Sequence, residues 1–174
     1  MSSPPPFGRS LDPEYGIDSI LIYRHTRGVT RVEYHPVFAE QFTALCENPD
    51  AMEIAGEVTS LLVALEDHGH DLEGEASDDP SHPVVTSRFH MFALRRTPPT
   101  TYTPYADAPP VIRIPYVWFL DPANEELAVV MLLGDKTALG NFWYPTRVNE
   151  IETRLIPGWE SANHGHHARI RRTR

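Results

Sequence analysis

Three segments of the sequence carry basic and aromatic side chains in settings where they could act on a phosphate group. They are residues 87–95 (SRFHMFALR), 112–114 (IRI) and 134–144 (GDKTALGNFWY). Arginine and lysine hold phosphate oxygens and stabilise the negative charge that builds on them. A nearby tyrosine or histidine can transfer a proton. Gathered on one sheet surface, such residues suit metal-free cleavage of RNA.

Arg113 and Lys136 are the most informative of these cations. Arg113 lies in a run of apolar residues, where a charge needs an anionic partner or an open cleft. Lys136 directly follows the strand that we expect to pair with the strand of Arg113, and it is the only lysine among 15 basic residues. A GC-rich genome explains the shortage of lysine equally well. Strand arginines could also pair with surface acids, and Tyr144 could simply pack.

The charge of the chain is unevenly distributed. The 174 residues carry a formal net charge of −9, and residues 44–87 contain eleven acidic residues but no lysine or arginine. From Lys136 to the end there are seven basic and three acidic residues. An acidic protein can bind nucleic acid through a locally basic face. The overall acidity nevertheless argues against avid non-specific binding of RNA.

The composition is that of a globular protein with one domain, 41% hydrophobic and 22% charged. No apolar run approaches the roughly 20 residues of a membrane span, and the first residues lack the features of a signal peptide, so we expect a cytoplasmic protein. Cys46 is the only cysteine, which excludes an internal disulfide and a multi-cysteine zinc site. The histidines lack further ligands at metal-binding spacing, so we expect no metal or cofactor.

The first half of the chain predicts a short hairpin followed by two helices. A flexible arm over residues 1–17 precedes strands at 19–23 and 29–34. Pro36 opens the first helix, and Asp50 with Glu53 gives the second a start that resembles a capping box. The second helix then buries one apolar face, formed by Ile54, Val58, Leu61, Leu62 and Leu65.

The second half predicts three strands and a last helix. The expected elements are a strand at 84–96, a proline-rich loop at 97–110, a strand at 111–120, a turn at 121–124, a strand at 126–133, a helix at 147–155 and a polar tail at 157–174. Together with the first half, this order predicts an α+β fold. We expect one domain over 18–156, with a small antiparallel sheet, two N-terminal helices packed on one face and a short C-terminal helix.

The segment from residue 111 to 145, with 87–95 upstream, resembles the phage-derived HigB-like branch of the RelE toxin superfamily. Members of that branch show a strand that ends in Leu-Arg and a strand with Arg followed by hydrophobic and aromatic residues. An Asp-Pro turn, a strand ending in Gly-Gly-Asp-Lys and an aromatic pair then precede a last helix. The resemblance covers roughly residues 29–156, and it implies a RelE-like fold.

The resemblance also implies roles for individual residues. Arg113 would contact the scissile phosphate, Lys136 would be the cation at the end of the next strand, and Tyr144 would stack on a base or transfer a proton. Arg95 and His90 correspond to the family's Leu-Arg strand end and the histidine before it. Further RNA contacts would come from Arg88, Arg96 and Trp143.

The function implied is that of a toxin in a type II toxin–antitoxin system. Such a toxin cleaves mRNA on the ribosome by attack of the 2′-hydroxyl, needs no metal, and is neutralised by a helix-turn-helix antitoxin as a dimer or heterotetramer. The chain departs from the family pattern at Phe92 and Ala93, which replace a charged pair, and in its acidity. A ParE-like toxin that binds gyrase without catalysis, or a phage accessory protein that uses the acidic loop 66–79, are alternative readings.

Overall fold

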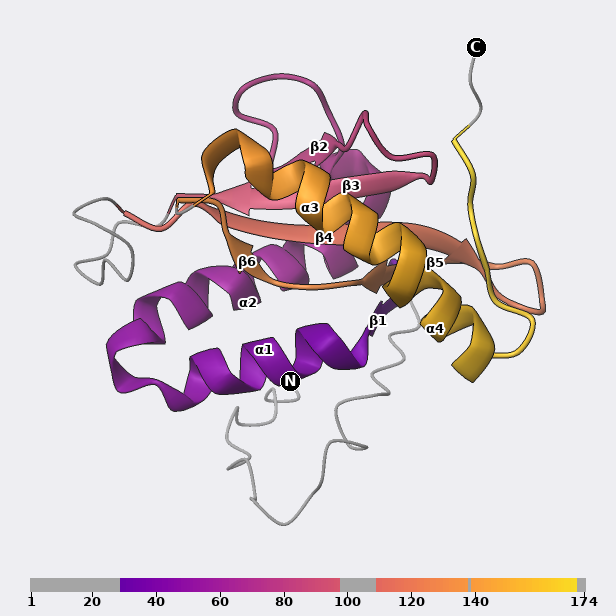
Figure 1. Ribbon diagram of the computed structural model, residues 1–174, viewed down its shortest axis with the longest axis horizontal. Helices are drawn as coiled ribbons and strands as arrows, with labels where there is room; N and C mark the ends of the chain where they lie inside the picture. The colour runs from indigo at the N-terminus through magenta and orange to yellow at the C-terminus, as the bar shows by residue number, and fades with distance from the viewer. Residues whose placement is uncertain (1–28, 98–108, 138, 172–174) are drawn as a thin grey trace, which may run out of the picture.

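A computed structural model describes residues 29–97, 109–137 and 139–171, in which a sheet separates two layers of helices (Figure 1). The expected arm at 1–17, the strand at 19–23 and most of the proline-rich loop lie outside the described residues. The elements are β1 (Val32–Tyr34), α1 (Pro36–Glu47), η2 (Pro49–Ala51), α2 (Met52–His68), η3 (Gly69–Leu72), β2 (Ser81–Pro83), β3 (Met91–Arg96), β4 (Ile112–Leu120), β5 (Glu126–Val130), β6 (Gly134–Asp135), η4 (Gly140–Phe142), α3 (Trp143–Glu150), η5 (Ile151–Leu155), α4 (Ile156–Ala162) and β7 (His167–Ala168).

The sheet is mixed rather than antiparallel, which corrects the expectation from the sequence. Its strand order is β1-β5-β4-β3-β2, and β6 and β7 also pair with β4. β1 runs parallel to β5, while the other pairs are antiparallel. Parallel neighbours need a long connection between them, and here almost the whole domain lies between β1 and β5.

β4 is buried on both faces, as its nearly continuous apolar sequence predicts. Ile114, Tyr116 and Trp118 point to one face, and Val117 and Phe119 point to the other. Each of these side chains is at most 2% exposed. A strand of this kind requires a helical layer on each side of the sheet.

The pair α1 and α2 covers the first face, as expected. Phe38 of α1 and the predicted apolar stripe of α2 pack against β3, β4 and β5. The first helix begins where the sequence predicts it, because the Val37 amide donates to His35 Nδ1 (3.1 Å) and Pro36 occupies the first turn. Asn48 caps the short turn before α2 by accepting from the Asp50 amide (3.0 Å).

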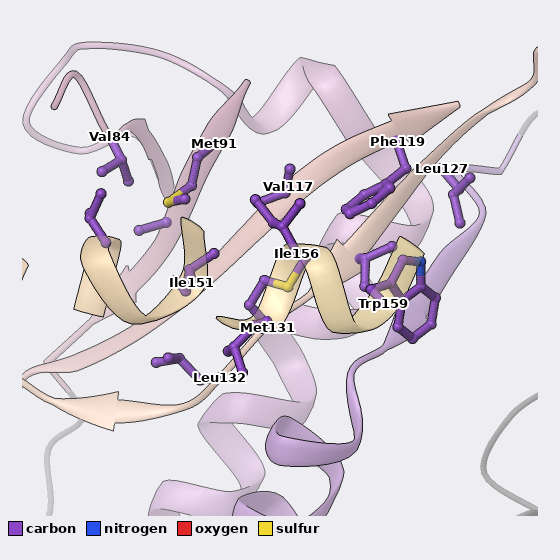
Figure 2. Close-up of a cluster of buried hydrophobic side chains, with 14 of the residues drawn as sticks. Val84, Met91, Val117, Phe119, Leu127, Met131, Leu132, Ile151, Ile156 and Trp159 are labelled. Carbon is purple, nitrogen blue, oxygen red and sulfur yellow. The ribbon is translucent and has the colours of Figure 1, made fainter. Parts of the chain in front are cut away.

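A helix longer than expected covers the second face (Figure 2). The sequence predicts a helix at 147–155, but α3, the π-helical turn η5 and α4 together run from Trp143 to Ala162. Ile151, Ile156 and Trp159 pack on the same cluster as Val117 and Phe119. The wider π-helical turn keeps Ile151, Leu155 and Ile156 all buried.

Two further segments differ from the sequence prediction. Residues 84–90 form a turn, in which the Ser87 amide donates to Val84 O (3.0 Å), so only Met91–Arg96 of the predicted strand is a strand. The predicted tail at 157–174 begins inside a helix, and its later part pairs with β4 through β7. The turn at 121–124 is confirmed, with Asn124 at a φ of 60°.

Gly134 must lack a side chain because Trp143 packs directly on it. A Cβ at residue 134 would lie 2.5 Å from Trp143 Cζ2, whereas a Cβ at Gly158 of α4 would meet open space. We expect Gly134→Ala to destabilise the fold by about 1–3 kcal/mol through overpacking. Gly158→Ala should be neutral or stabilise by up to about 1 kcal/mol, because alanine is the better helix former. Urea unfolding of both variants checks this, and equal stabilities would contradict the packing of Trp143 on Gly134.

Candidate active site

Four of the five predicted catalytic residues meet at one end of the sheet. Arg95 of β3 lies opposite Arg113 of β4, and Arg113 lies opposite Gly134 of β6 on its other side. Lys136 follows β6, and its Nζ lies 5.6 Å from the ring centroid of Tyr144. We call Arg95, Arg113, Lys136 and Tyr144 the cationic cluster.

Asp135 holds the backbone on which Lys136 sits. Its Oδ1 accepts hydrogen bonds from the Val111 amide (2.9 Å), the Thr137 amide (2.8 Å) and the Thr137 hydroxyl (2.6 Å). The Lys136 amide in turn donates to Val111 O (2.9 Å). These bonds fix the end of β6 to the start of β4, so that Lys136 is placed beside Tyr144.

The cations of the cluster have no carboxylate partner within the described residues. Most other described arginines form ion pairs, for example Arg31 with Asp121 at 2.6 Å and Arg96 with Glu57 at 2.6 Å. Arg113 donates to its neighbour's carbonyl, Ile112 O, at 2.8 Å, and its guanidinium also hydrogen-bonds Tyr144 inside the cluster. Half-buried cations without counter-ions create a positive potential that favours a bound anion.

Arg95 also has a structural role. Its Nε donates to Asp79 O (3.3 Å), and its Nη2 donates to Ala76 O (3.4 Å) and to Ser77 O. The guanidinium therefore ties the acidic loop before β2 to the sheet. Arg95 therefore contacts backbone carbonyl oxygens of this loop. Among the described residues it forms no ion pair with a carboxylate.

Tyr144 is protonated at neutral pH in this setting. Burial raises the pKa of its hydroxyl, and the neighbouring guanidinium groups of Arg113 and Arg95 offset only part of that rise. A protonated phenol beside two guanidinium groups can donate a proton or a hydrogen bond to an oxygen of a bound anion. It is poorly suited to accept one.

His90, the fifth predicted catalytic residue, lies elsewhere. It precedes β3, and its ring lies beside His70, with the two ring centroids 6.2 Å apart. Its ring packs edge-on against Phe92, which belongs to the face that α1 and α2 cover. His90 therefore takes no part in the cationic cluster.

The three residues predicted to bind RNA are also dispersed. Arg88 pairs with Glu152 at 3.5 Å, and Arg96 pairs with Glu57 of α2. Trp143 is 1% exposed and packs in the core, so its side chain is not available for the RNA contact predicted for it.

A second group of polar residues, centred on His70, was not predicted from the sequence. His70 Nδ1 bonds Glu73 Oε2 (2.9 Å), its Nε2 bonds Glu126, and its ring stacks on Trp118 with centroids 3.8 Å apart. The Glu73 carboxylate also accepts from Trp118 Nε1 (2.6 Å) and the Tyr116 hydroxyl (3.0 Å). No local pattern indicates this network, because Glu126 is far from His70 in sequence.

His70 and His90 lie side by side with opposite protonation preferences. Their ring centroids are 6.2 Å apart. Partial burial lowers the pKa of His70, but the hydrogen bonds to Glu73 and Glu126 outweigh it, so the pKa is raised. Burial lowers the pKa of His90, and Arg169 lowers it further. His70 therefore keeps its proton to higher pH than a free imidazole does, and His90 loses its proton at lower pH.

Comparison of the chain with family models, curated proteins and solved structures finds no match. Within residues 29–97, 109–137 and 139–171, no group of three or more histidine, cysteine, aspartate or glutamate side chains could hold a metal ion. In the same residues no helix has the length and apolar character needed to cross a bilayer.

The two histidines predict opposite dependences of stability on pH. The raised pKa of His70 means that its stabilising effect is complete below the unfolded-state value of about 6.5 and is lost as pH rises through the folded-state pKa. We expect His70→Gln to destabilise more at about pH 5.5 than at about pH 9. The difference should stay below about 1 kcal/mol, because the side chain is 47% exposed.

His90→Gln should behave in the opposite way. The lowered pKa of His90 means that the wild-type fold loses stability as pH falls below about 6.5. The variant escapes this loss, so its stability relative to the wild type should improve on acidification. Urea unfolding of both variants across this range measures the two trends, and parallel trends would contradict the pairing of His70 with the two glutamates.

Proposed function

We propose that the chain is a metal-independent endoribonuclease of the RelE/HigB type, acting as the toxin of a toxin–antitoxin pair in the cytoplasm. The observation that carries the proposal is the cationic cluster: Arg95, Arg113 and Lys136 converge on Tyr144 without a described counter-ion. The α+β fold with two helices on one face of the sheet is compatible with it.

The cluster can bind and polarise a scissile phosphate. The Arg113 guanidinium and the Lys136 ammonium would contact the non-bridging oxygens and stabilise the charge that develops on them. Attack of the ribose 2′-oxygen forms a bond to phosphorus, and the bond from phosphorus to the 5′-oxygen breaks. The products are a 2′,3′-cyclic phosphate and a free 5′-hydroxyl, and no metal takes part.

Tyr144 fits the role of the general acid in this reaction. Because burial raises its pKa, its hydroxyl carries the proton that the leaving 5′-oxygen needs. The proton of the 2′-hydroxyl passes to water, since His90 lies too far from the cluster to accept it. Catalysis would then depend mainly on electrostatic stabilisation by the cations.

The partners follow from the same proposal. The substrate is mRNA held in the ribosome, because the net charge of −9 disfavours non-specific binding of free RNA. A small helix-turn-helix antitoxin would cover the cationic cluster and neutralise the toxin. The alternative function is a toxin that binds gyrase without cleaving RNA, and the experiment below distinguishes the two.

The test is expression in a bacterial host with growth measurement and mapping of the 5′ ends of cellular mRNA. We expect the wild type to arrest growth and to produce new mRNA ends. Arg113→Ala and Lys136→Ala should lower cleavage by about 10²–10³-fold, because each removes a group that stabilises charge on the phosphate. Tyr144→Phe, which deletes only the hydroxyl, should slow cleavage without preventing binding.

Arg31→Ala is the matched control, because Arg31 pairs with Glu33 and Asp121 outside the cluster. It should cleave as the wild type does. Growth arrest with intact mRNA would replace the ribonuclease with a binding toxin. No effect from a soluble, folded chain would remove the toxin proposal altogether.

A further inference from the structure

The C-terminal segment of the chain occupies a gap at the end of the sheet. β3 and β4 pair from Arg96 and Ile112 up to Met91 and Val117. Beyond Val117, residues 167–169 lie beside β4 in the place that β3 leaves, and Ile170 pairs with Phe89 just before β3. The segment runs along this end of the sheet towards the C-terminus (Figure 1). β5 pairs with the other side of β4 at this end, so the C-terminal segment completes the sheet.

Backbone hydrogen bonds hold this segment on both sides. The Arg169 amide donates to Trp118 O of β4 (2.8 Å), and the His90 amide donates to Arg169 O (2.7 Å). The Arg171 amide donates to Arg88 O (2.8 Å). We call the space bounded by the end of β4 and by residues 88–90 the C-terminal slot.

The side chains of the segment bury little apolar surface. One is small and one is charged. Ala168 packs against the core, and its amide donates to Glu160 Oε1 (2.8 Å). Arg169 pairs with Glu126, the carboxylate that also bonds His70. Ile170 is 72% exposed. Segments with few buried apolar contacts open at low free energy.

The link between α4 and the segment, and the open pocket beside it, allow the segment to dissociate from the sheet. α4 ends at Ala162, and the chain then turns through Gly165, which has a φ of +83°. An open pocket of about 1030 Å³ lies along the segment and is lined in part by Arg169, Arg171 and His90. The slot is therefore reachable from solvent along one side.

We propose that the C-terminal slot is a binding site for extended peptides in which a small residue precedes an arginine, and that the chain's own C-terminal segment fills it in cis. A segment of this chemistry from a partner protein would replace residues 167–171 and add a strand to β4. The backbone groups at residues 88–90 and 118 give affinity. Glu126 selects the arginine, and the core contact at Ala168 selects a small residue. This inference is independent of RNA cleavage.

The test cleaves the backbone between α4 and the C-terminal segment after the protein has folded. A protease recognition sequence is inserted between Asn163 and His166 of the full chain, the purified protein is cut, and a fluorescent peptide with the sequence of residues 163–174 is added. We expect the cut segment to stay bound and to exchange with the peptide. The Arg169→Ala peptide should bind about two- to fivefold more weakly, because it loses a partly exposed ion pair. The Ala168→Leu peptide should bind at least about tenfold more weakly, because the larger side chain does not fit against the core. Ile170→Ala should bind unchanged, since Ile170 is exposed.

A charge exchange provides a second readout. A Glu126→Arg chain should prefer the Arg169→Glu peptide over the native one. In the uncut chain, hydrogen exchange should show that Arg169→Glu exposes the amides of His90 and Arg171 while that of Val117 stays protected. Release of the cut segment without peptide binding, equal binding of all four peptides, or unchanged protection in Arg169→Glu would each overturn the proposal.

Discussion

β4 carries most of the hydrogen bonding of the sheet, because β3, β5, β6 and β7 all pair with it. Its side chains are buried on both faces, so neither layer of helices can be removed without exposing an apolar surface. The α1–α2 pair and the long C-terminal helix are therefore equally necessary. The loops, the cationic cluster and the C-terminal segment are all positioned relative to this one strand.

The burial of β4 also explains why polar chemistry lies at its two ends. At one end Arg95, Arg113, Lys136 and Tyr144 project where the apolar face stops, and the cations lack described counter-ions. At the other end His70 and Arg169 neutralise Glu73 and Glu126. The first end is electrostatically prepared for an anion. At the second end the acidic and basic side chains pair with one another, so this end holds parts of the chain together.

Local patterns in the sequence predicted α1, α2, β4 and the turn at 121–124, because periodicity and capping act over a few residues. The shared site of Arg113, Lys136 and Tyr144 was implied by the family resemblance rather than by local pattern, because the sequence could not fix the register of the strands that bring them together. The parallel pairing of β1 with β5 depends on distant contacts and was missed. The alternation of strand side chains already placed His90 and Arg95 on opposite faces, and that signal could have separated them. Nothing local indicated that His70 meets Glu126.

The position of β7 in the sequence has a consequence for biosynthesis. Domains fold progressively as the chain emerges from the ribosome, N-terminal parts first. Residues 167–171 emerge after every other described strand, yet they complete the edge of β4 near Trp118. A nascent chain with the rest of its sheet assembled thus still presents unpaired backbone groups at that edge. Until residues 167–171 have emerged, this edge is open to any strand already present in the cell.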